Sequence, residues 1–154
     1  MRELYPINDD ARKYLSEISI IVERIAVCKR EIEYASANLT SYGSSGIAER
    51  VSATPIKDAM ELQILNSIEA QNKWYALLLK NEDDLQKKRH EAIDRIFKVK
   101  SKTSRLFLIR HYIDGKDLQD ISVEFGHSDP SSVYNLHSYA LRDFSEVWDL
   151  YGWE

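Results

Sequence analysis

The sequence contains few of the residues that break or cross-link a chain, with one cysteine, three prolines and five glycines among 154 residues. A single cysteine excludes an intrachain disulfide, and Cys28 lies in an apolar stretch where we expect a buried thiol. Scarce glycine and proline, together with 30% charged residues, favour a mostly helical protein. The composition therefore predicts an all-α fold.

Long apolar runs are also missing. The longest, "ISIIV" and "YALLL", fall far short of the roughly 20 residues that a membrane-spanning helix needs. The N-terminal "MRELYPINDDARKYL" has no apolar stretch of signal-peptide length. We therefore expect no membrane partner and a cytoplasmic location.

The common signatures of enzymes are absent from the sequence. It has no H-E-x-x-H pattern, no glycine-rich phosphate loop and no Cys/His set with metal-ligand spacing. We expect no enzymatic activity, no catalytic residue, no cofactor and no bound metal.

Positive charge is unevenly distributed along the chain, whose net charge is -4. Residues 111–154 hold two basic residues against nine acidic ones, a balance of about -7. Residues 87–105 hold eight basic residues against two acidic ones, a balance of about +6. Any basic surface that contacts nucleic acid is therefore expected just before the C-terminal segment.

Two long amphipathic segments predict a helical hairpin over residues 1–100, with a loop at about 40–54. The first helix is expected over about 9–39, capped by Asn8, and the second over about 55–99. The first apolar seam comprises Leu15, Ile18, Val22, Ile25, Ile32 and Leu39. The second comprises Ile64, Ile68, Gln71, Tyr75, Leu78, Glu82, Leu85, Arg89, Ala92, Ile96 and Val99 in heptad register. The second helix should outrun the first by roughly four turns and carry the basic cluster on that overhang.

Further apolar residues lie off the second seam and widen its apolar face. They are Trp74, Leu77, Leu79 and Ile93. A wide apolar face favours dimerisation, so we expect a homodimer formed through the hairpin, in addition to the pairing within one chain.

Residues 101–154 have the punctuation of a helix-turn-helix. A first short helix, "SKTSRLFLIRHYIDG", should turn Leu106, Ile109 and Ile113 inward. Asp117 begins a second helix that ends at Gly126, and Ser128 or Asp129 caps the third, whose first residue is Pro130.

The third helix, the candidate recognition helix, has one apolar and one polar face. Val133, Leu136, His137, Ala140, Leu141, Phe144, Val147 and Trp148 share the face expected to be buried. His137 on this face is expected to be a hydrogen-bonded core residue. The opposite face carries Asn, Ser and Arg, which can bond base edges in a major groove. The candidate DNA-binding residues are Ser131, Ser132, Asn135, Ser138, Tyr139 and Arg142 on this helix, with Lys116, Lys98, Lys100, Lys102 and Arg105 as phosphate contacts.

The segment "LIRHYIDGKDLQDISVEFGHSDPSSVYNLHSYAL" resembles the sigma-70 region 4-like helix-turn-helix. The whole chain resembles the ArpU/RinA-like late transcription activators of phages and prophages of Gram-positive bacteria. The matching positions are Arg110, Tyr112, Ile113, Gly115, Ile121, Gly126, Ser128, Val133, Tyr134, Leu136, His137, Ala140 and Leu141. This resemblance implies a transcription regulator in a bacterial host cell. It departs from the family at Leu118, where tryptophan is common, and at Asn135, Ser138 and Tyr139, which are often basic.

Two functions stay open. The first is a regulator that binds double-stranded DNA through the helix-turn-helix and activates late genes. The second is a sigma-like module that binds RNA polymerase or another regulatory protein with little DNA binding of its own, which the acidic C-terminal segment favours.

Overall fold

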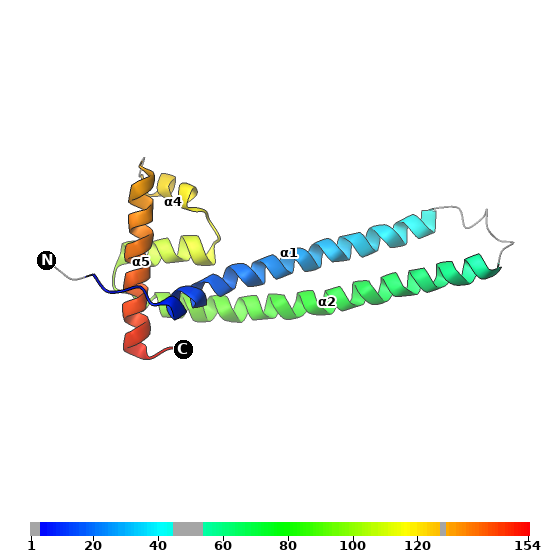
Figure 1. Cartoon of the computed structure of the whole chain (residues 1–154), viewed down its shortest axis with the longest axis horizontal. Coiled ribbons are helices and arrows are strands. Elements are labelled where there is room, and N and C mark those ends of the chain that lie inside the picture. The colour runs from blue at the N-terminus through cyan, green and yellow to red at the C-terminus, as the bar shows by residue number, and fades with distance from the viewer. Residues whose placement is uncertain (1–3, 45–53, 127–128) are drawn as a thin grey trace. The chain divides into compact units, whose positions relative to one another are not determined.

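The computed structural model describes residues 4–44, 54–126 and 129–154, and these residues form helices and loops without a strand (Figure 1). The elements are α1 (Asp9–Ser44), α2 (Thr54–Ile96), α3 (Lys102–Leu108), the π-helix η2 (Ile109–Ile113), α4 (Leu118–Glu124) and α5 (Pro130–Tyr151). The expected all-α fold is confirmed. The helix α1 continues about a turn beyond its expected end, and residues 45–53 of the expected loop lie outside the described residues.

The chain divides into two compact units. The terminal unit comprises Met1–Ile21 and Leu85–Glu154, and the middle unit comprises Val22–Asp84. This division differs from the boundary near residue 100 expected from the sequence. The difference arises because Leu15 of α1 and Ile96 of α2 are buried in one core with the residues of α3, η2, α4 and α5.

In the terminal unit, α1 and α2 pair in antiparallel register with no overhang of α2. The Tyr14 hydroxyl donates to Glu91 at 2.8 Å, and Lys88 pairs with Glu17. This register places Asp9, where α1 begins, level with Ile96, where α2 ends. The expected overhang is therefore wrong, and the first half of the basic cluster lies beside α1.

The face of α2 that lies toward α1 is a heptad seam, but half of its positions differ from the expected ones. Its positions, all buried or half-buried, are Met60, Ile64, Ser67, Gln71, Trp74, Leu78, Asn81, Leu85, Lys88 and Ala92. Of the expected residues near the end of this seam, Ile96 and Val99 are buried and Arg89 is half-buried. Expected Ile68, Tyr75 and Glu82 are exposed, and the residue before each of them lies inward. In the middle unit this seam includes a hydrogen bond of 2.7 Å from Gln71 to Ser36.

The seam of α1 needs a similar correction. Val22 is exposed, whereas Cys28 and Ala35 are buried with Ile25 and Ile32. The expectation of a buried Cys28 thiol is confirmed.

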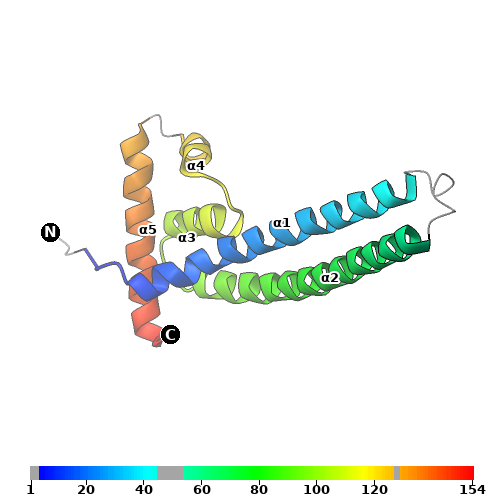
Figure 2. The ribbon, with the colours of Figure 1, turned by 45° about the vertical axis from the view of Figure 1, so that its right-hand side comes forward.

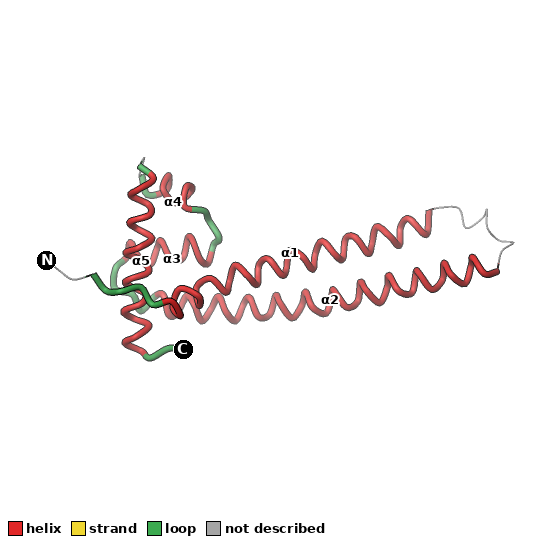
Figure 3. The backbone as a smooth tube through the Cα atoms, viewed as in Figure 1, coloured by secondary structure: helices red, strands yellow, loops and turns green. Residues whose placement is uncertain are grey.

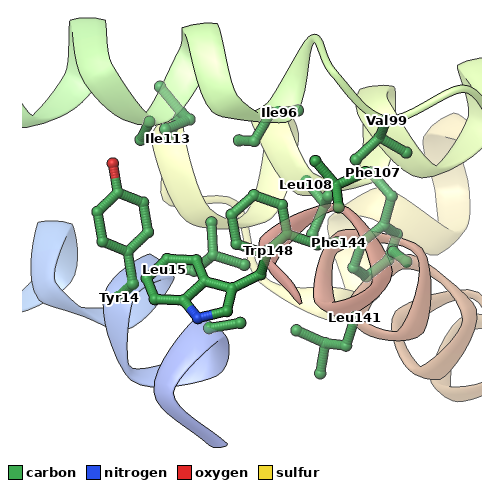
Figure 4. Close-up of a cluster of buried hydrophobic side chains, with 14 of the residues drawn as sticks. Tyr14, Leu15, Ile96, Val99, Phe107, Leu108, Ile113, Leu141, Phe144 and Trp148 are labelled. Carbon is green, nitrogen blue, oxygen red and sulfur yellow. The ribbon is translucent and has the colours of Figure 1, made fainter. Parts of the chain in front are cut away.

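The core of the terminal unit forms where α5 packs on α3 and on the paired ends of α1 and α2 (Figures 2 and 4). Phe144 and Trp148 of α5 lie at its centre, with the Trp148 ring 5.1 Å from the Tyr14 ring. Asn8 caps α1 as expected, since its side-chain oxygen accepts from the backbone N–H groups of Asp10 and Ala11. Residues 97–101 connect α2 to α3, and residues 114–117 connect η2 to α4 (Figure 3).

The first C-terminal helix presents the expected inward face only in part, since Ile113 is buried and Ile109 packs against the core, but the expectation is wrong for Leu106. Phe107 and Leu108 are buried, whereas Leu106 is exposed. The chain adds a π-helical turn at Ile109–Ile113, which is one residue longer per hydrogen-bonded turn than an α-helix. The added residue rotates the chain, so Ile113 is buried while Leu106 is not.

Replacement of Phe144, which is fully buried, with alanine should lower the free energy of unfolding by about 3–5 kcal/mol because it leaves a cavity in the core. Phe97→Ala is the matched control, since Phe97 is 62% exposed and should change stability little. Urea unfolding followed by circular dichroism measures both. Equal losses for the two variants would contradict this packing of α5.

Candidate nucleic-acid interface

A glycine turn and two capping aspartates set the ends of α4 and α5. The Asp117 carboxylate accepts from the Asp120 N–H at 2.8 Å and caps α4. Gly126 follows α4 with a φ of 74°, a left-handed conformation that favours glycine. Asp129 caps α5 and accepts from the N–H and hydroxyl of Ser131. These bonds hold the pKa of Asp129 below its usual value.

The predicted inward face of α5 is confirmed. Val133, Ala140, Leu141, Phe144, Val147 and Trp148 are buried, and Leu136 and His137 are half-buried. Packing of these residues on α3 and α4 fixes which side of α5 faces solvent.

His137 is a hydrogen-bonded core residue, as expected. The Tyr112 hydroxyl of η2 forms a hydrogen bond of 2.7 Å with His137 Nε2, and the rings of His111 and Phe107 lie against the imidazole. Burial, with the neighbouring His111 charge, lowers the pKa of His137 to about 4. Burial also raises the pKa of Tyr112 to about 12, so this pair is neutral near pH 7.

The solvent face of the N-terminal half of α5 is polar and aromatic. Ser131, Asn135 and Tyr139 are exposed, and Ser132 and Ser138 are half-buried. Tyr134, which the sequence places at the edge of this face, is also exposed. We call Ser131, Asn135, Ser138, Tyr134 and Tyr139 the outer face of α5.

Arg142 lies about one helical turn after Tyr139 and forms a hydrogen bond with the N-terminal segment of the chain. Its Nη1 donates to the Tyr5 carbonyl at 3.0 Å. Nearby, the Asn8 N–H donates to Ser145 at 2.8 Å, and the Tyr5 hydroxyl donates to Asp149. Residues 5–8 thus bind along the C-terminal half of α5. No local pattern predicts these contacts, because the partners lie more than 130 residues apart.

The expected phosphate contacts do not form one cluster. Arg105 donates to the carbonyls of Val99 and Lys100 at 2.7 and 2.8 Å, and Lys116 pairs with Glu124. Exposed Lys98 lies over the ring of Tyr151, at the C-terminal end of α5. Tyr151 follows Asn135 by 16 residues, about 24 Å along the helix, so Lys98 is remote from the outer face.

Lys100 and Lys102 are exposed at the start of α3. The N terminus of α3 lies beside the middle of α5, because the Ser104 hydroxyl donates to Asp143. These two lysines are therefore the exposed members of the expected set that lie nearest the middle of α5.

Comparisons with models of known protein families, with curated proteins and with solved structures found no match to this chain. In the described part of the chain, no helix is long and apolar enough to cross a membrane. The same residues contain no group of three or more His, Cys, Asp or Glu side chains arranged to hold a metal ion.

The buried histidine makes stability depend on pH. Because the pKa of His137 falls from an ordinary value of 6.5 to about 4 on folding, the folded chain binds this proton less well than the unfolded chain. The stabilisation is complete above pH 6.5 and is lost as the pH falls toward 4. We expect the urea midpoint to drop between pH 7 and pH 5.

His137→Gln retains a hydrogen-bonding side chain for Tyr112, whichever group donates, and removes this titration, so its urea midpoint should vary less over the same range. His90→Gln, at an exposed position of α2, is the control and should keep the wild-type dependence. An identical pH profile in His137→Gln and wild type would show that another group is responsible.

Proposed function

We propose that this chain is a phage or prophage transcription regulator that binds double-stranded DNA through α4 and α5 in the cytoplasm of a bacterial host. The sequence resemblance to the ArpU/RinA-like late activators supports this proposal and favours activation of late genes. In this proposal, α5 enters the major groove as the recognition helix, and the chain acts as a homodimer without enzymatic activity.

The observation that carries the proposal is the outer face of α5. Asn135 is exposed at its centre, and an asparagine can bond both the N6 and N7 atoms of adenine. Ser131 and Ser138 lie one turn away on either side and can bond a base or a phosphate, while Tyr139 offers an apolar ring to thymine methyl groups.

Phosphate contacts are assigned to Lys100 and Lys102, the exposed lysines at the start of α3. Lys98 lies over Tyr151, about 24 Å along α5 from Asn135, so it can contact only phosphates near the C-terminal end of α5. Three further cations already contact protein acceptors, so each can bind phosphate only if DNA replaces that acceptor. They are Arg142, Arg105 and Lys116.

A second function is favoured by the way these cations are engaged. With three of the expected cations bound to protein acceptors, the outer face of α5 is poor in positive charge and surrounded by Asp129, Asp143 and Glu146. Such a face suits a protein partner as well as DNA, and RNA polymerase or another regulatory protein is the alternative partner.

Two substitutions separate base reading from phosphate contact. Asn135→Ala should weaken binding to the preferred DNA sequence by about 1–3 kcal/mol and leave binding to unrelated DNA unchanged. Lys100→Ala should weaken both equally and reduce the slope of log affinity against log salt by about 0.9. Fluorescence anisotropy over a salt series measures both effects. Lys73→Ala, an exposed lysine of the middle unit, is the control.

The decisive measurement is a mobility shift with DNA from upstream of the chain's own gene at low and moderate salt. Retardation at low salt that depends on Asn135 supports DNA binding. No retardation at low salt, together with capture of purified RNA polymerase by the outer face, overturns it in favour of the second function. Arg142→Ala is unsuited to this test because it also releases Tyr5.

A further inference from the structure

A second heptad of apolar residues lies exposed on α2 in the middle unit. Leu65, Ile68, Tyr75 and Leu79 are 56%, 39%, 47% and 65% exposed, and exposed Asn72 completes the series. We call these five residues the α2 stripe. Their spacing of three, four, three and four residues is that of the a and d positions of a coiled coil.

The α2 stripe is a different face from the one that packs on α1. At 100° per residue, its centre lies about 100° around α2 from the seam that contains Gln71, Trp74 and Leu78. The shallow groove between α1 and α2 lies on yet another side, where Gln63, Asn66 and Ala70 contribute from α2. The stripe is therefore a separate surface that α1 leaves open to solvent.

We propose that the α2 stripe is a parallel, in-register coiled-coil seam that joins two copies of this chain. The inference deepens the homodimer of the proposed function by naming the surface that forms it. A heptad stripe fits a helix with the same repeat, and a second copy supplies one with identical spacing.

The charges at the two ends of the stripe select the orientation. In a parallel, in-register pair each residue of the stripe packs against the same residue of the other chain. Four of the five residue pairs are then apolar, and the fifth is Asn72 with Asn72. The next d positions are Glu61 and Glu82, both exposed, and repulsion between like carboxylates ends the seam there. The paired segment is therefore about 21 Å long.

Antiparallel pairing fits less well. In an antiparallel pair, each a position packs against a d position of the other helix. Two such registers keep the apolar residues of the stripe together. One sets Leu65 against Glu82, and the other sets Leu79 against Glu61. Each register buries a carboxylate next to a leucine at both ends, which costs desolvation without a partner.

The central polar residue also favours the parallel pair. Asn72 occupies the middle a position, where a single asparagine specifies register and oligomeric state in parallel dimers. In the parallel pair the two Asn72 amides can hydrogen-bond to each other. The antiparallel registers would set Asn72 against Tyr75 or against Ile68, and the Ile68 pairing would leave the amide without a polar partner.

The seam also suits the proposed DNA binding. A parallel pair brings the C-terminal ends of the two α2 helices to the same end of the assembly. The DNA-binding segments of both chains then follow the paired segment in the same chain direction, as two half-sites on one DNA duplex require.

Sedimentation equilibrium of the full chain tests the surface. We expect a monomer–dimer equilibrium with a dissociation constant on the order of micromolar, since a five-layer seam is small. Ile68→Glu should raise this constant by about tenfold or more, because it places a carboxylate in an apolar layer. Leu77→Glu is the matched control, because Leu77 is also 39% exposed but lies on the opposite side of α2 from the stripe.

Cross-linking tests the orientation. In a Cys28→Ala background, Leu79→Cys should form an intermolecular disulfide under mild oxidation, because a parallel pair sets the two copies of position 79 side by side. Lys80→Cys, at an exposed neighbouring position, should cross-link far less. A dimer that resists Ile68→Glu, or a wild-type chain that stays monomeric at 100 µM or more, overturns the surface. A dimer sensitive to Ile68→Glu in which Leu79→Cys does not cross-link overturns the parallel arrangement.

These results are independent of DNA binding. If Ile68→Glu abolishes the dimer and single chains still bind DNA weakly, the result supports the seam, whichever DNA sequence the chain prefers. A dimer that fails to bind any DNA leaves the seam in place and contradicts only the regulator function.

Discussion

A guanidinium stacked among aromatic rings connects the two ends of the sequence in the terminal unit. The Arg95 guanidinium carbon lies 4.5 Å from the Tyr14 ring centroid and 4.6 Å from that of Trp153, with Trp148 close by. It thereby joins α1, α2 and the residues after α5, and it pairs with Glu91 on α2 itself. Within the described residues its Nη1 is buried without a hydrogen-bond partner, so the charge is stabilised by stacking on the rings together with the ion pair to Glu91.

Arg95 illustrates how this chain uses most of its C-terminal positive charge. Arg89 donates to the Ile113 carbonyl at 2.7 Å and satisfies the end of the π-helix, while Arg105 binds the carbonyls that follow α2. Arginine suits these roles because its planar group makes several hydrogen bonds and stacks on rings. A basic stretch in the sequence is therefore a poor measure of the charge available to a phosphate, and Lys100 and Lys102 account for much of what remains exposed near α5.

Local chemistry predicted the ends and the buried face of the helices more reliably than the pairing between them. The caps at Asn8, Asp117 and Asp129 and the inward face of α5 follow from residues within one or two turns. The α1-facing seam of α2 was half wrong because two heptads overlap on that helix. Ile68 is more apolar than Ser67, and once Ile68 is taken into the seam the heptad spacing leads on to Tyr75 and Glu82 instead of Trp74 and Asn81. At the candidate site, the exposure of Asn135 followed from the helical wheel, whereas the contact of Arg142 with Tyr5 depends on long-range packing.

The π-helical turn between α3 and α4 has a consequence for how this chain should be aligned with any other. Ile109–Ile113 accommodates one residue more than an α-helix needs to reach the same point, and Arg89 and Tyr112 both make contacts at that turn. A chain without the turn could keep the same core with one residue fewer. An alignment without a gap would then match Phe107 and Leu108 to solvent positions, and a single-residue gap within this turn would restore the equivalence of the buried positions on both sides.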